Sequence, residues 1–339
     1  MTLISHSHLP AFERLKQEGQ EVLSTKEANT QDIRELHVGL YNMMPDAALE
    51  ATERQFLRLI GSSNQIAQFF VHLFSPKSIK RTDKMKNHVN EYYQDLEQFK
   101  NQGLDALIIT GANPSEKNIE DEVFWDEFTD LVSWAHDHVT STICSCLATH
   151  AIFKLFYQEE RILQSKKVWG VFSHQLQNKD HPLVRNINTK FDTPHSHHYS
   201  ISTEQAEKHG VIVLVTSEEA GLHIATTKDF RFVFTQGHPE YDTQSLLKEY
   251  KREYNRFHAG VRKDYPPLPK NYFSTPAQRL IQQTDVFPEK LLLPYLDNTW
   301  SDTSKAFFNN WLGLVYKITH KNRKIRLMKH LDQDNPLEL

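Results

Sequence analysis

The 339-residue chain contains only two cysteines, Cys144 and Cys146, with one serine between them. A disulfide joining them would close a very small ring, and side chains two apart in a strand point in parallel rather than toward each other. A structural zinc site would need further cysteine ligands, and there is no second cysteine pair. We therefore expect no disulfide, no redox pair and no metal site, which leaves one reactive cysteine or two packing residues.

Long apolar runs are also missing. No segment approaches the ~20 residues needed to cross a bilayer, and the first residues lack the charged, apolar and small-residue regions of a secretory signal. The net charge is -4, so nothing points to a polyanion as partner. We expect a cytoplasmic protein that acts on small molecules, without a nucleic-acid or membrane partner.

What the chain does contain is a regular alternation of two patterns. Short β-branched or apolar runs predict strands, and segments with apolar residues three and four apart predict amphipathic helices. The predicted strands are residues 36–43, 68–74, 105–111, 141–146, 168–173, 210–217, 222–227 and 230–237, and the helices between them are residues 48–62, 89–103, 122–138 and 147–160. This alternation predicts an α/β fold whose sheet is mostly parallel and flanked by helices.

The strand pattern stops after HPEYD, at residue 242. A helix over residues 244–260 follows, then a proline-bearing loop and a last helix over residues 304–318. We therefore expect an N-terminal extension over residues 1–35, an α/β domain over residues 36–260, and a C-terminal loop and helical appendage over residues 261–339 that packs on the domain.

Cys146 lies at the predicted turn between a buried strand, STIC, and a helix that begins LATHA. This is the position of a nucleophile elbow, where the N–H group of the next residue, Leu147, faces the same space as the side chain. The helix N-terminus favours a thiolate at Cys146, whereas Cys144 lies within the strand. A buried structural cysteine remains the alternative at this point.

A candidate base and its partner follow the last predicted strand. In TQGHPEYD, His238 and Glu240 lie just beyond the strand end, where the active sites of open α/β sheets collect. Residues two apart in an extended segment project to the same side, so Glu240 can orient the imidazole while the other ring nitrogen faces a thiol. A surface loop with an incidental histidine and glutamate is the alternative.

The order of these motifs resembles the homoserine O-acyltransferase family, also called homoserine O-succinyltransferases, within the class I glutamine-amidotransferase-like superfamily of flavodoxin-like α/β proteins. The resemblance runs almost from end to end. It rests on the N-x-M-P turn at NMMP, TERQFLRLIG, LDALIITGAN, STICSCLATHA, VWGVFSH, TPHSHHYS, TQGHPEYD and the C-terminal NYF and WSDTSKAFFNNWL.

The resemblance implies a ping-pong acyltransferase. Cys146 would take an acetyl or succinyl group from acyl-CoA as a thioester, with His238 as general base and acid, Glu240 orienting it and the Leu147 N–H group in the oxyanion hole. The acyl group would then pass to the hydroxyl of homoserine, or of serine, in methionine or cysteine biosynthesis. Acyl-CoA would be a co-substrate, no cofactor would stay bound, and the enzyme could be a homodimer.

The resemblance also implies further substrate contacts. Arg252 stands where the family has an arginine for the amino acid's carboxylate, and His197 replaces an arginine in the pocket wall. Ser115, with Glu116 beside it, occupies the position associated with the choice between succinyl and acetyl donors.

Some positions depart from the family pattern. A lysine usually follows the N-x-M-P turn, where this chain has Asp46 and Ala47, and His150 replaces a glutamine after the elbow. The donor and the acceptor therefore stay open at this stage. A glutaminase or other hydrolase of the superfamily, and a non-catalytic or tailoring descendant, remain alternatives.

Overall fold

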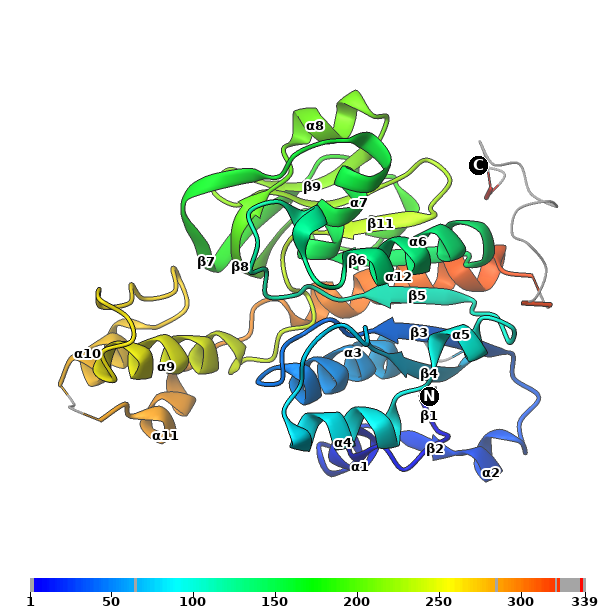
Figure 1. Cartoon of the computed structure of the whole chain (residues 1–339), viewed down its shortest axis with the longest axis horizontal. Coiled ribbons are helices and arrows are strands. Elements are labelled where there is room, and N and C mark those ends of the chain that lie inside the picture. Colours follow the sequence, from blue (N-terminus) through cyan, green and yellow to red (C-terminus); the bar gives the residue numbers. More distant parts are fainter. Residues whose placement is uncertain (1–2, 64–65, 284–285, 321, 324–335, 338–339) are drawn as a thin grey trace.

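The computed structural model describes residues 3–63, 66–283, 286–320, 322–323 and 336–337. Within these residues the strands form one sheet with the order β2-β1-β4-β3-β5-β6-β11-β10-β9-β7-β8 (Figure 1). Neighbouring strands are parallel from β2 to β11 and antiparallel from β11 to β8. The mostly parallel sheet flanked by helices confirms the predicted fold class.

The parallel part consists of β2 (Val22–Ser24), β1 (Leu3–Ser5), β4 (Gln68–Phe74), β3 (Glu35–Tyr41), β5 (Ala106–Ile109), β6 (Ser141–Ser145) and β11 (Phe232–Thr235). The antiparallel part consists of β10 (Gly221–Thr226), β9 (Ile212–Ser217), β7 (Ile162–Leu176) and β8 (Lys190–Ser200). All eight predicted strands are present. The sequence analysis missed β1, β2 and β8.

Helices cover both faces of the sheet because alternate residues of each buried strand point to opposite sides. In β5, Ala106 and Ile108 belong to one apolar core, whereas Leu107 and Ile109 belong to another. The first core is closed by α1 (Pro10–Gln17), α3 (Leu49–Ser63) and α12 (Ser301–Ile318), and the second by α6 (Trp125–His138) and α7 (Leu147–Tyr157).

The single helix predicted over residues 89–103 is wrong. The structure instead has α4 (Asp83–Tyr92) and α5 (Leu96–Phe99), and Tyr93 between them is extended. The extended segment interacts with the sheet: the Gln94 N–H group donates to the Leu73 carbonyl oxygen, and the Asn42 amide donates to the Tyr93 hydroxyl. These long-range bonds outweigh the local helical pattern.

The two ends of the chain extend this domain in different ways. β1 and β2 add to the edge of the sheet, so part of the first 35 residues belongs to the main layer. After β11 the chain forms α9 (Ser245–His258), α10 (Thr275–Gln283) and α11 (Glu289–Leu292), which project beyond the carboxyl ends of the parallel strands before α12 returns to the sheet (Figure 1). Part of the region expected as the appendage lies outside the described residues.

Among the described residues, no helix has the length and apolar character needed to span a membrane.

Candidate active site

Cys146 forms the tight turn that joins β6 to α7. Its backbone has φ 50° and ψ -106°, a conformation that a non-glycine residue adopts only under strain. The Cys146 N–H group donates to the Thr235 carbonyl oxygen at the end of β11 (2.6 Å), so the backbone of the neighbouring strand holds the turn. The residue is 9% exposed, at the boundary between the core and the site.

His238 and Glu240 meet as a buried pair beside this turn. Their Nδ1 and Oε1 atoms are 2.8 Å apart, and the backbone N–H group of His238 donates to the Pro194 carbonyl oxygen of β8. Burial alone would lower the pKa of His238, but the Glu240 carboxylate and a hydrogen bond with Cys146 outweigh it and raise that pKa well above its ordinary value. The imidazole is therefore suited to take the thiol proton.

The first turn of α7 offers a place for a developing oxyanion. The Leu147 N–H group makes no hydrogen bond within the part of the chain that the structure describes. A Cβ atom added at Gly111, in the loop after β5, would lie 3.5 Å from the Cys146 Cβ and 3.9 Å from the Leu147 nitrogen. The loop after β5 therefore packs directly against the elbow, beside a free donor.

Gln236 also contacts the thiol, and the sequence analysis did not identify it. Its Nε2 atom donates to the Cys146 sulfur over 3.8 Å, and its Oε1 atom lies 2.7 Å from Nε2 of His150. Both side chains are buried. Gln236 directly follows β11 and lies two residues before His238. This closeness to a predicted site residue is the signal in the sequence that could have identified Gln236.

Three buried imidazoles form a hydrogen-bonded chain behind the pair. His174 Nδ1 lies 2.8 Å from the Phe172 carbonyl oxygen, and His174 Nε2 lies 3.0 Å from His195 Nε2. His195 Nδ1 lies 3.0 Å from His197 Nε2. Burial lowers the pKa of His174 to about 4 and of His197 to about 3, so these rings are neutral near pH 7.

The Phe172 carbonyl oxygen sets the direction of this chain because it can only accept. His174 must then carry its proton on Nδ1, His195 on Nε2 and His197 on Nε2. The chain packs on Gly237, where an added Cβ atom would lie 2.6 Å from His195 Nε2. The imidazole chain therefore supports the backbone of the residue that precedes His238.

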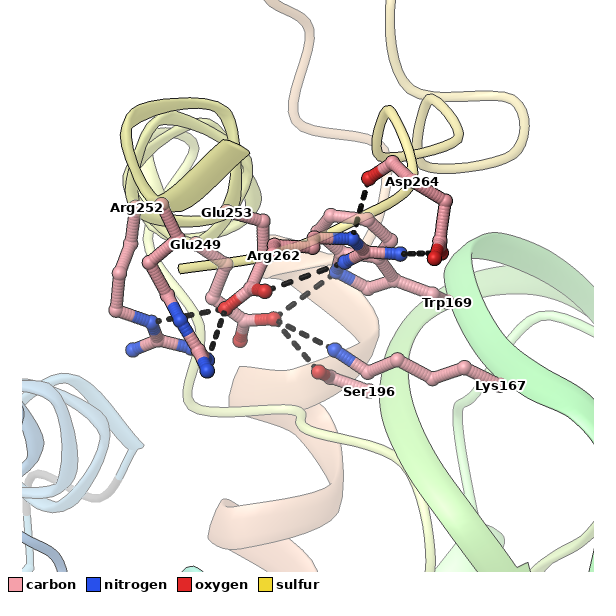
Figure 2. A network of polar contacts seen from close by, with 9 residues as sticks. Lys167, Trp169, Ser196, Glu249, Arg252, Glu253, Arg262 and Asp264 are labelled. Atoms are coloured by element: carbon pink, nitrogen blue, oxygen red, sulfur yellow. Dashed lines mark hydrogen bonds and ion pairs between the residues drawn. The ribbon is translucent and has the colours of Figure 1, made fainter. Parts of the chain in front are cut away.

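The other face of β8 belongs to a second polar group, centred on Glu249 of α9 (Figure 2). The Glu249 carboxylate accepts hydrogen bonds from Ser196 Oγ (2.6 Å) and Trp169 Nε1 (2.9 Å), and Lys167 Nζ lies 3.5 Å away. Tyr241 joins this group to the His238–Glu240 pair, since its hydroxyl donates to Glu249 (2.6 Å) and its ring stacks on His238.

The remaining predicted site residues form their hydrogen bonds with partners other than Cys146, His238 and Glu240. Arg252 is 51% exposed on α9, one turn after Glu249, and pairs with Glu253 (Figure 2). Ser115 and Glu116 are exposed in the loop after β5, where both N–H groups donate to the Glu122 carboxylate. His197 is buried in the imidazole chain.

Asp46 stands at the position where the resemblance implies a lysine. Its carboxylate is held by polar contacts with two neighbouring residues, Arg81 and Thr82. Its carboxylate accepts hydrogen bonds from the Thr82 N–H and hydroxyl groups (2.7 Å each) and pairs with the buried guanidinium of Arg81 (3.2 Å). Arg81 also donates to the Met44 carbonyl oxygen. This cluster clamps the N-x-M-P turn to the segment that precedes α4.

Both cysteines are free thiols, and Cys144 is fully buried. Burial raises the pKa of the Cys144 thiol far above its ordinary value, which leaves it unreactive near neutral pH. In the described part of the chain, no group of three or more His, Cys, Asp or Glu side chains is arranged to hold a metal ion.

Known proteins of one family match this chain over almost its whole length. Residues 2–321 match the family model described as homoserine O-succinyltransferase. Proteins named homoserine O-succinyltransferase are 51% identical in Methylobacter tundripaludum, over all of both chains, and 52% identical in Nitrosococcus oceani, over 100% of this chain and 99% of the relative. A third, from Cardiobacterium hominis, is 45% identical over 99% of each chain.

Among solved structures, a glutamine amidotransferase from Thermotoga maritima is 11% identical, with a TM-score of 0.49 over 83% of this chain and 98% of that one. The family model and the full-length relatives, together with the end-to-end order of motifs, settle the classification. The chain belongs to the homoserine O-succinyltransferase family.

Proposed function

We propose that this enzyme transfers a succinyl group from succinyl-CoA to the hydroxyl of homoserine, through a thioester on Cys146, as a step in methionine biosynthesis. The observation that carries the mechanism is the strained Cys146 turn, joined by hydrogen bonds to the segment that holds His238 and Glu240. The relatives' names support the choice of succinyl and homoserine.

In the first half-reaction, His238 takes the thiol proton and the Cys146 sulfur attacks the thioester carbonyl carbon of succinyl-CoA. The carbon–sulfur bond to CoA then breaks, and the departing CoA sulfur receives the proton from His238. The Leu147 N–H group stabilises the oxyanion of the tetrahedral intermediate. Gln236 donates to the Cys146 sulfur while it carries negative charge.

In the second half-reaction, His238 takes the proton of the homoserine hydroxyl, whose oxygen attacks the carbonyl carbon of the acyl-enzyme. The new carbon–oxygen bond forms as the bond to the Cys146 sulfur breaks, and the proton returns to the thiolate. Glu240 holds the imidazole in one orientation during both steps. Acyl-CoA is a co-substrate here, and no permanently bound cofactor takes part.

Two cations are suited to the carboxylates of the substrates. Arg252 is assigned to the carboxylate of homoserine, which a planar guanidinium can bind through two hydrogen bonds. Lys167 is assigned to the free carboxylate of the succinyl group, because its Nζ atom lies 3.5 Å from the Glu249 carboxylate. That carboxylate also accepts a hydrogen bond from Tyr241, whose ring stacks on His238. His197 contributes to the pocket wall, and Ser115 and Glu116 belong to the loop on the donor side.

Intact-mass measurement after incubation with succinyl-CoA alone tests the proposal. We expect one succinyl adduct in the wild type and in Cys144→Ala, and none in Cys146→Ser. Added homoserine should discharge the adduct and form O-succinylhomoserine. Since Cys144 is the only other cysteine, Cys144→Ala is the matched control for a thiol outside the site.

Acetyl-CoA and serine serve as the competing donor and acceptor in the same assay. A preference for acetyl-CoA, or discharge by serine rather than homoserine, would contradict the assigned substrates while leaving the thioester mechanism intact. Release of ammonia from glutamine without any acyl adduct would contradict the mechanism itself. The cytoplasmic location and the homodimer stay predictions, which fractionation and light scattering can check.

The assignment of Lys167 makes a separate prediction about donor choice. Lys167→Met should lower kcat/KM for succinyl-CoA by about tenfold or more, because a charged hydrogen bond is lost, and should change kcat/KM for acetyl-CoA much less. An equal loss with both donors would remove Lys167 from succinyl recognition.

A further inference from the structure

One face of α9 forms a basic groove, of which the reaction described so far uses only Arg252. The side chains on this face recur at intervals of three and four residues, as neighbours on a helix do. Together with Val261 and Glu289 they line an open groove of about 520 Å³, and they are Lys248, Lys251, Arg252, Asn255, Arg256 and Ala259.

The groove is basic although the chain as a whole has a net charge of -4. Of the carboxylates near the groove, Glu289 pairs with Lys251 (2.5 Å). Glu253 pairs with Arg252, with Arg256 and with Arg262, which does not line the groove. Figure 2 shows Glu253 between Arg252 and Arg262. The cations outnumber these carboxylates. The Arg256 side chain is 53% exposed, so its charge is available to a ligand.

The helix that lines the groove also carries Glu249, the centre of the polar group beside His238. Lys248, at the inner end of the groove, is next in sequence to Glu249, whose carboxylate binds the Tyr241 hydroxyl, and the Tyr241 ring stacks on His238. From Lys248 to Ala259 the helix rises about 16 Å, at 1.5 Å per residue. The groove therefore leads away from the catalytic pair, along the helix that projects from the sheet (Figure 1).

The donor of the proposed reaction has a matching distribution of charge. Its reacting thioester must reach Cys146, whereas its three phosphate groups, two in a diphosphate and one on the ribose, lie at the far end of the long pantetheine arm. Arginine and lysine side chains bind phosphate oxygens through strong, charge-assisted hydrogen bonds. We propose that the α9 groove binds the phosphate groups of acyl-CoA, an inference that rests on the proposed function.

The proposal is tested by comparing two donors that share the thioester. Succinyl-CoA carries the phosphates, and S-succinylpantetheine lacks them. For the double variant Lys251→Ala/Arg256→Ala, we expect the ratio of kcat/KM for succinyl-CoA to that for S-succinylpantetheine to fall at least about tenfold, from the lost charged hydrogen bonds. Adenosine 3′,5′-bisphosphate should compete with succinyl-CoA in the wild type and much less in the variant.

Lys208→Ala is the matched control. Lys208 is also an exposed lysine paired with one glutamate, Glu159, but it lies on α8 (Thr203–Lys208), outside the groove. This variant should keep the wild-type donor ratio. Arg252 is left unchanged in all variants because it is assigned to the acceptor.

A donor ratio in the double variant equal to that of the wild type would overturn the groove assignment, whether kcat/KM falls for both donors or for neither. Failure of the proposed function gives a different result: the wild type would then form no adduct on Cys146 with either donor, and the groove assignment would fall with it. A thermal melt of the double variant that matches the wild type confirms that the exposed substitutions left the fold intact.

Discussion

In the proposed mechanism, the contact between Nδ1 of His238 and Oε1 of Glu240, 2.8 Å apart, prepares the imidazole to activate Cys146. Burial works against a charged imidazole, and the carboxylate is the main group that reverses this and raises the pKa of His238. Without that carboxylate, burial would again dominate and the imidazole would be a poorer base.

Replacing Glu240 by Gln keeps the shape of the side chain and removes its charge. We expect the rate of Cys146 acylation at pH 7 to fall by at least about a hundredfold, as happens when the carboxylate of such a triad is neutralised. Rapid-quench mass spectrometry of the acyl-enzyme measures this rate. A rate within threefold of the wild type would show that Glu240 does not support the base.

Gln236 allows a second test, which asks whether its hydrogen bond stabilises the thiolate form of Cys146. Gln236→Leu removes the donor to the Cys146 sulfur and should slow alkylation of Cys146 by iodoacetamide at pH 7 by about tenfold, because the thiolate is the reacting form. His150→Gln should have a smaller effect, since a glutamine amide can still donate to Gln236 Oε1. If Gln236→Leu reacts as fast as the wild type, Gln236 only packs beside the thiol.

β8 shows what one strand adds to the active site. Its alternation sends His195 and His197 to the imidazole chain and Ser196 to Glu249, so both polar groups are positioned by a single strand. β7, which pairs with β8, carries one partner in each group: His174, which bonds His195, and Trp169, which lies opposite Ser196 and also donates to Glu249.

The contact between the imidazole chain and the turn after β11 can be tested with glycine substitutions. Gly237→Ala would place Cβ 2.6 Å from His195 Nε2 and 2.8 Å from the Thr193 Cγ2 atom, so we expect a destabilisation of about 1–3 kcal/mol. The same substitution should also lower activity, because His238 is the next residue. Urea unfolding and the acylation assay measure the two effects.

Gly313, inside α12, is the matched control. Apart from the backbone of its own helix, no atom of the described residues lies within 4 Å of a Cβ added there. Gly313→Ala should therefore stabilise the protein by about 0.5–1 kcal/mol through helix propensity. Equal effects of the two substitutions would contradict the close packing at Gly237.

The protein as a whole buries many neutral histidines, and this gives its stability a defined dependence on pH. Burial lowers the pKa of His150, His174 and His181 to about 4 each, whereas histidine in an unfolded chain titrates near 6.5. Between these values the unfolded chain binds protons that the folded protein does not, so stability falls as the pH falls.

We expect the free energy of unfolding to decrease by about 1 kcal/mol per pH unit for each such histidine between pH 6.5 and 5, since the unfolded histidine gains its proton progressively over this range. His238 contributes in the opposite direction: its raised pKa adds stability below pH 6.5 that is lost as the pH rises through the folded pKa. Urea unfolding at pH 7.5, 6.5 and 5 measures the sum. A free energy that stays constant or increases toward pH 5 would show that these histidines are not held neutral.

Much of this molecule could be predicted from local patterns in its sequence. The spacing of apolar residues reports which side of an element is buried, and this was enough for the α/β class and for eight strands. The turn between STIC and LATHA, and the HPE segment after a strand, placed the proposed nucleophile and its base at the same edge of the sheet. Each of these features depends on neighbours in the chain.

The tertiary structure decided what those patterns could not specify. Strand β8, Gln236 beside the thiol, the Glu249 cluster and the exposed positions of Ser115 and Glu116 all follow from which distant segments become neighbours. A periodic pattern shows that a side chain is buried but does not show which residue it contacts. That contact depends on the order of the strands in the sheet. Only the folded chain brings His195, Gly237 and Cys146 together around one site.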